Sequence, residues 1–155
     1  MGIKDVPDKF FLVAGKGDAE YGLNAFDIAL LNAGVGNTNL IRLSSILPPN
    51  AKEIKPVRFK LGELISIAYA SKISSIKGEV IAAAIAVAIP EDPLLNGLIM
   101  EHSGPGTAEE IESIVIKKAE LGMQYRNYKI KDIKSISVEH TTKDIGAVFA
   151  GAVLL

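Results

Sequence analysis

Apolar residues along the first third of the chain follow two different spacings. Residues 9–14 are a run of β-favouring side chains and predict a strand, which the glycine-rich run 15–18 is expected to end. Through residues 24–33, apolar side chains recur at three- and four-residue steps, at Phe26, Ala29, Leu30 and Ala33. This spacing predicts a short helix that Gly34 can end.

The next segment, residues 39–46, is predicted to be extended. Pro48 and Pro49 must lie outside it, because proline has no N–H to donate to a sheet ladder. Apolar stretches later in the chain predict further strands at residues 64–73, 80–89, 96–102, 133–139 and 146–154.

A second helix is predicted to begin at Thr107. Thr107 and Glu110 have the spacing of a capping box, and one side of the following segment is apolar, with Ile111, Ile114, Val115, Ala119 and Leu121. Gly122 is expected to end this helix. No linker, repeat or low-complexity tract divides residues 1–155, so the sequence predicts one α+β domain with two helices and largely antiparallel sheets.

Composition favours a self-associating protein over one that binds nucleic acid. The chain has 155 residues, of which 48% are hydrophobic, yet only 6% are aromatic and tryptophan is absent. This excess of aliphatic and small residues is more than one small domain hides, which predicts a homo-oligomer. The net charge is −1 and no basic stripe is present to neutralise phosphates, so no nucleic-acid partner is expected.

The same composition argues against several kinds of site and location. Cysteine is absent, which excludes thiol chemistry, and the two histidines make no metal-ligand cluster, so no metal is expected. Residues 1–5 lack the apolar core of a signal peptide. The apolar run 80–89 is about half the length that crosses a bilayer. We therefore expect a cytoplasmic protein that does not insert into membranes.

Five short motifs carry the functional information. Ser44-Ser45 lies inside residues 39–49, and a bare serine pair is by itself an ordinary feature of a strand or turn. Its companions are Leu-Asn-Ala-Phe-Asp at 23–27, Leu-Leu-Asn-Ala-Gly at 30–34, Gly-Leu-Ile-Met-Glu at 97–101 and Ser-Val-Glu-His-Thr at 137–141. In this order, across about residues 10–152, they resemble the pyruvoyl-dependent arginine decarboxylase family. The resemblance implies an αββα sandwich and a trimer of processed protomers, each made of a β chain (residues 1–44) and an α chain (residues 45–155).

The chemistry implied for the serine pair is self-cleavage. The Ser45 hydroxyl can attack the preceding carbonyl and exchange the amide for an ester. β-Elimination then frees Ser44 as a carboxyl terminus and leaves dehydroalanine at position 45, which hydrolyses to a pyruvoyl group with loss of ammonia. Without pyridoxal phosphate, this group would form a Schiff base with L-arginine and release CO2 and agmatine, as in polyamine synthesis.

The resemblance assigns Asn39 as the amide that stabilises the oxyanion formed at the Ser44 carbonyl. Along one straight strand, six steps of about 3.3 Å would place Asn39 roughly 20 Å from Ser45. Either the segment bends sharply, or the amide comes from a neighbouring subunit. We favour a subunit interface, because it also accounts for the apolar excess.

The resemblance also assigns a proton donor and a substrate site. Glu101 would protonate the substrate carbon after CO2 leaves, and a carboxyl at an apolar strand end can be held protonated by desolvation. Asp27 would bind the guanidinium group. Residues around the aliphatic part of the substrate would be Leu31, Gly36, Thr38 and Ile46, and the Thr38 hydroxyl leaves the fine substrate preference open. His102 and His140 are not assigned to catalysis.

Two alternatives stay open from the sequence. The chain could be a pyruvoyl decarboxylase of histidine or another amino acid, since Asp27 favours a cationic side chain without excluding histidine. It could also be an unprocessed trimer that binds a small molecule and whose serines are structural.

Overall fold

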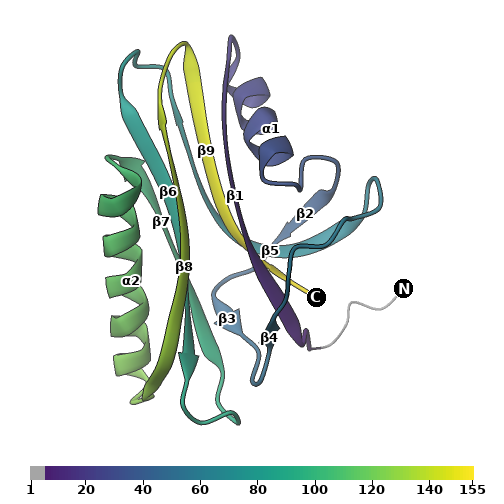
Figure 1. The fold of residues 1–155 in the computed structure, drawn as a ribbon, viewed down its shortest axis with the longest axis vertical. Helices are drawn as coiled ribbons and strands as arrows, with labels where there is room; N and C mark the ends of the chain where they lie inside the picture. Colours follow the sequence, from purple (N-terminus) through teal and green to yellow (C-terminus); the bar gives the residue numbers. More distant parts are fainter. Residues whose placement is uncertain (1–5) are drawn as a thin grey trace.

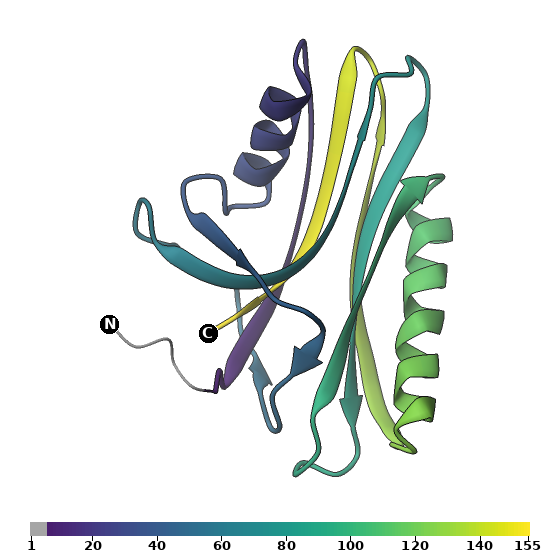
Figure 2. The ribbon, with the colours of Figure 1, turned by 180° about the vertical axis from the view of Figure 1, so that it is seen from behind.

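The protein is an αββα sandwich of four layers. The computed structural model describes residues 6–155, so residues 1–5, on which the signal-peptide argument depends, lie outside the described chain. Within residues 6–155, two helices cover the outer faces of two stacked sheets (Figure 1). Seen from behind, the same layers are reversed in order (Figure 2). The predicted α+β class and the αββα arrangement are confirmed.

Sheet A is built from five strands in the order β2-β5-β9-β1-β4. Its strands are β2 (Asn39–Arg42), β5 (Leu64–Ser74), β9 (Ile145–Leu154), β1 (Lys9–Ala19) and β4 (Lys52–Glu53). Only its edge pairs, β1 with β4 and β2 with β5, are parallel within the described chain. The helix α1 (Gly22–Asn32) packs against the outer face of this sheet through Ala25, Ala29 and Ala33.

Sheet B has four antiparallel strands in the order β3-β7-β6-β8. These are β3 (Ile46–Leu47), β7 (Gly97–Pro105), β6 (Val80–Pro90) and β8 (Ile130–Thr141), and α2 (Ala108–Tyr125) covers their outer face. Along β6, Ile81, Ala83, Ile85 and Val87 face sheet A, whereas Ala82, Ala84, Ala86 and Ala88 face α2. The continuous apolar run of this strand therefore reflects burial on both faces.

The expected end of the first strand at residues 15–18 is wrong. β1 continues through this glycine-rich run, and its pairing with β9 extends to Ala19 opposite Ile145. A Cβ at Gly15 would lie 2.1 Å from the carbonyl oxygen of Ala29 in α1. Glycine is needed at this position because the helix approaches the strand closely. In the sequence alone, the same glycine looks like a turn signal.

The predicted end of α1 and the predicted start of α2 agree with the structure, whereas the predicted end of α2 does not. α1 ends as expected, with Gly34 in the left-handed region at φ +83 and its N–H donating to the carbonyl of Leu31. The Thr107 capping box is confirmed at the start of α2. However, α2 passes through Gly122 to Tyr125, so the predicted end is wrong. Neither helix within residues 6–155 is long and apolar enough to cross a bilayer.

The segment 39–46 is not one strand but two strands in different sheets. β2 lies at the edge of sheet A, and β3 lies at the edge of sheet B. The chain therefore crosses from one sheet to the other between Arg42 and Ile46, as the path from β2 to β3 in Figure 2 shows. The short strand β4 was not anticipated from the sequence.

Candidate active site

Ser44 and Ser45 occupy the crossover between the two sheets. Before them, the Leu43 N–H donates to the carbonyl of Ile67 in sheet A at 2.9 Å. After them, the Ser45 carbonyl accepts from the Ile99 N–H in sheet B at 2.7 Å. Within residues 6–155, the Ser44 carbonyl and the Ser45 N–H make no hydrogen bond. The peptide bond between the serines is thus held from both sides while its own polar groups stay available for chemistry.

Glu101 lies on the strand next to this crossover. The register that pairs Ile46 with Leu98 places Ser45 opposite Ile99, and Glu101 is two residues further along β7. Because side chains alternate along a strand, Glu101 and Ile99 share the face of β7 that is directed toward sheet A. The sequence predicts Glu101 at a strand end, but Glu101 lies in the middle of β7. Its side chain is 39% exposed in the single chain.

Arg42 is a component of the site that the sequence analysis missed. Its guanidinium group donates to Oε1 of Glu101 at 2.8 Å and to the carbonyl of Tyr69 at 3.0 Å. The guanidinium carbon also lies 4.4 Å from the centre of the Tyr69 ring. In the sequence, its only signal was a cation two residues before the serine pair, and the partners that fix it are distant in the chain.

Asn39 lies at the other end of β2 from the serine pair. It is exposed, it stands opposite Leu64 in the β2–β5 ladder, and its side-chain amide donates to the carbonyl of Gly62 at 3.0 Å. The bend in the segment falls after β2, so β2 itself remains regular between Asn39 and the crossover. In the single chain, the Asn39 side chain is therefore hydrogen-bonded to a loop and not to the Ser44 carbonyl.

The expected substrate residues near α1 form a separate group. Asp27 and Leu31 are one helical turn apart and exposed. Leu31 packs so closely against Gly36 that a Cβ at that glycine would lie 2.6 Å from the leucine side chain. The Thr38 hydroxyl donates to the carbonyl of Val35 at 2.6 Å.

Ile46 belongs with the serine pair and Glu101 at the edge of the sandwich, and it is exposed. No hydrogen bond or ion pair within residues 6–155 joins this edge group to the α1 group. Large apolar side chains are exposed on α1, β2, β3, the loop before β5 and the start of β5, at Leu23, Leu31, Ile41, Ile46, Leu61 and Leu64. The single chain therefore holds two parts of the expected site on surfaces that carry uncovered apolar side chains.

The two histidines have structural partners. Nε2 of His140 lies 2.7 Å from Oδ2 of Asp18, and Asp18 also accepts from the N–H groups of Lys143 and Asp144. Burial raises the pKa of Asp18, but these hydrogen bonds outweigh it, and the pKa lies below its ordinary value of 3.8. The carboxylate thereby ties β1 to the β8–β9 hairpin.

The other histidine, His102, faces α2, where its Nδ1 lies 2.9 Å from the ammonium of Lys118. Burial, and then the charge of Lys118, lower the pKa of His102. Its ring is therefore suited to accept a hydrogen bond from the lysine. Within residues 6–155, no three His, Asp or Glu side chains gather as metal ligands.

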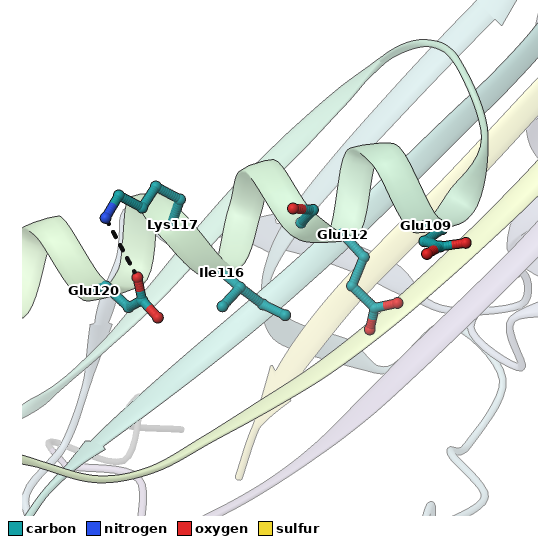
Figure 3. Close-up of a pocket in the computed structure, with 6 residues that line it drawn as sticks. Glu109, Glu112, Ile116, Lys117 and Glu120 are labelled. Carbon is teal, nitrogen blue, oxygen red and sulfur yellow. Dashed lines mark ion pairs between the residues drawn. The ribbon is translucent and has the colours of Figure 1, made fainter.

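A depression of about 490 Å³ lies along α2 (Figure 3). Its lining includes Glu109, Glu112, Lys117 and Glu120, and Lys117 pairs with Glu120 at 3.7 Å. Glu112 also accepts from the hydroxyls of two β8 serines. None of the residues expected in the active site lines this depression.

The fold and the site together define a class of protein: a two-sheet sandwich in which the chain passes between sheets through a serine pair, beside a glutamate on the adjacent strand. The sequence model of the family described as pyruvoyl-dependent arginine decarboxylase (PvlArgDC) matches residues 9–155. The chain belongs to this family.

Individual relatives agree with this assignment. Proteins named pyruvoyl-dependent arginine decarboxylase from Methanocaldococcus jannaschii and Methanococcus vannielii are 48% and 49% identical to the chain. Each alignment covers 96% of this chain and 90% of the relative. A protein of the same name from Pyrococcus abyssi is 39% identical over 96% of this chain and 95% of its own length.

Proposed function

We propose that this chain is a proenzyme that cleaves itself between Ser44 and Ser45 and then decarboxylates L-arginine to agmatine and CO2. The observation that carries the proposal is the crossover geometry. The Ser44–Ser45 peptide is anchored to sheet A on one side and to sheet B on the other, yet its own carbonyl and N–H have no partner within residues 6–155. The names of the relatives supply the substrate.

Self-cleavage requires a nucleophile, a reachable carbonyl and a donor for the oxyanion. Ser45 provides the hydroxyl, and the Ser44 carbonyl is free to accept a hydrogen bond. Asn39 is the amide donor in this proposal, supplied by a neighbouring subunit, because its side chain lies at the far end of β2 from its own serine pair. The products are a fragment of residues 1–44 and a fragment of residues 45–155.

Residue 45 is well placed to carry a pyruvoyl group. The Ile99 N–H holds its carbonyl to β7, and this hydrogen bond does not depend on the peptide bond that breaks. The group, once formed, supplies a ketone that accepts electrons from the substrate as CO2 leaves. Glu101, two residues beyond Ile99 on the same face, delivers a proton to the substrate carbon.

Substrate binding in this proposal completes the site across a subunit interface. Asp27 binds the guanidinium group, and the aliphatic part of L-arginine lies among Leu31, Gly36, Thr38 and Ile46. The α1 group of one subunit meets the edge group of the next, which covers the apolar side chains that a single chain exposes. A cytoplasmic trimer of processed protomers is the assembly that we propose.

Intact mass under denaturing conditions tests the processing step. The wild-type protein should give two fragments that divide after Ser44, and Ser45→Ala should stay as one chain because the attacking hydroxyl is gone. Ser44→Ala is the matched control, since it removes the neighbouring hydroxyl and should still cleave. An intact wild-type chain would overturn the proposal, and CO2 release from L-histidine in place of L-arginine would overturn the substrate.

A further inference from the structure

Arg42 is fixed by three contacts that end in the Glu101 carboxylate. Its guanidinium group lies over the Tyr69 ring at 4.4 Å, and it donates to the Tyr69 carbonyl at 3.0 Å and to Glu101 at 2.8 Å. A planar guanidinium group can stack on a ring while it donates in its own plane, which an ammonium group cannot do. The arrangement therefore aims one N–H of Arg42 at one oxygen of Glu101.

Glu101 has little else to hold it. Its backbone is paired with Ile85 in β6, but its side chain is 39% exposed, and the carboxyl group has Arg42 as its sole hydrogen-bond partner within residues 6–155. A glutamate side chain has several rotatable bonds, so without a partner it samples many positions. A proton donor must instead stay at one distance from the reacting carbon.

We propose that Arg42 is a positioning residue for decarboxylation, which holds the Glu101 carboxyl beside residue 45. This inference rests on the proposed function, in which Glu101 delivers the proton. Arg42 precedes the cleavage point, whereas Tyr69 and Glu101 follow it. The contacts therefore join the two fragments, and residues 1–44 remain part of the working site after the peptide bond has broken.

The proposal separates decarboxylation from processing. The groups needed for cleavage are the Ser45 hydroxyl, the Ser44 carbonyl and the Asn39 amide, and within the described chain no hydrogen bond or ion pair joins any of them to Arg42. β2 also keeps its anchor to sheet A without the Arg42 side chain, through the Leu43 N–H and the ladder with β5. Loss of the guanidinium group should therefore leave cleavage intact and slow the later step.

The test compares Arg42→Ala, Arg42→Lys and the control Lys118→Ala, with cleavage followed by intact mass and decarboxylation by kcat and KM. Lys118 is a matched cation, because its ammonium contacts the Glu101 backbone carbonyl at 3.3 Å rather than the carboxylate. Arg42→Ala should cleave normally and lose about 10- to 100-fold in kcat, with KM changed by about threefold at most. Arg42→Lys should recover part of that loss, and Lys118→Ala should keep kcat within about twofold of wild type.

A second comparison uses the Glu101→Gln background. If Arg42 acts through Glu101, adding Arg42→Ala should not lower the remaining rate of that variant further. Three results for the single variant Arg42→Ala would overturn the proposal: a wild-type kcat, a rise in KM without a fall in kcat, or a failure to cleave between Ser44 and Ser45. Failure of the proposed function is a different outcome, because the wild-type protein itself would then release no CO2 from L-arginine.

Discussion

Replacing Gly15 with alanine should displace α1 from sheet A. The added Cβ would lie 2.1 Å from the carbonyl oxygen of Ala29 and 2.6 Å from the backbone nitrogen of Ala33, whereas ordinary contact begins at 3.4 Å. Both neighbours are backbone atoms, so rotation of a side chain cannot relieve the clash. The helix must move by roughly 1 Å, and overpacking of this kind costs about 1–3 kcal/mol.

We expect Gly15→Ala to reach the upper end of that range, about 3 kcal/mol. For a domain of this size, that loss lowers Tm by about 6–12 °C. The displaced helix carries Asp27, so KM for L-arginine should rise as well. Thermal unfolding and steady-state kinetics measure the two effects, at equal protein concentration because self-association adds to stability.

Gly104→Ala is the matched control for this experiment. Gly104 is also a buried strand glycine, but the nearest atom to its added Cβ would be the Ile111 Cδ1 at 3.9 Å, which is ordinary contact. It should be neutral or stabilising by up to about 1 kcal/mol. Wild-type Tm and wild-type KM in Gly15→Ala would refute the explanation of why β1 contains glycine.

Three further outcomes follow from the contacts described above. Asp18→Asn should cost about 1.5–3 kcal/mol in urea unfolding at pH 7, since the amide has one acceptor oxygen and cannot replace both Oδ2, which bonds His140 and Lys143, and Oδ1, which accepts from Asp144. Because the folded pKa of Asp18 is depressed, its contribution is present above pH 3.8 and fades as the pH falls further, so wild type and variant should converge in acid. Asp27→Asn should raise KM for L-arginine about 10-fold or more with cleavage unchanged, and a wild-type KM would remove Asp27 from the substrate site. Thr107→Ala should lose about 1 kcal/mol and keep full activity, because α2 covers the face of sheet B away from the serine pair.

The sequence predicts the elements of this fold well because their apolar patterns are long. The continuous apolar run of β6 and the Thr107–Glu110 spacing of the capping box are both visible in residues that are neighbours in the sequence. The predictions that glycine ends an element were less accurate. At Gly15 and Gly122 it serves a close approach between a helix and a strand, and a sequence does not reveal which segments will lie against each other.

The candidate site was predictable only in part, for a similar reason. The serine pair and Glu101 were assigned through a family resemblance, and the structure brings the crossover that holds the serines next to β7, the strand that carries Glu101. The division of residues 39–46 between two sheets could not be read from an apolar segment that suits one strand equally well. Arg42 was missed because its partners, Tyr69 and Glu101, are 27 and 59 residues away in the chain.

Reductive trapping of substrate on the purified protein tests directly whether residue 45 is the reactive carbonyl group. The protein is incubated with L-arginine, treated with borohydride and separated into its fragments for intact-mass measurement. If residue 45 carries the pyruvoyl group, fragment 45–155 alone should gain mass from the substrate, at its first residue, and Ser45→Ala should gain none. Unmodified fragments, or substrate attached at a lysine, would contradict this role of residue 45.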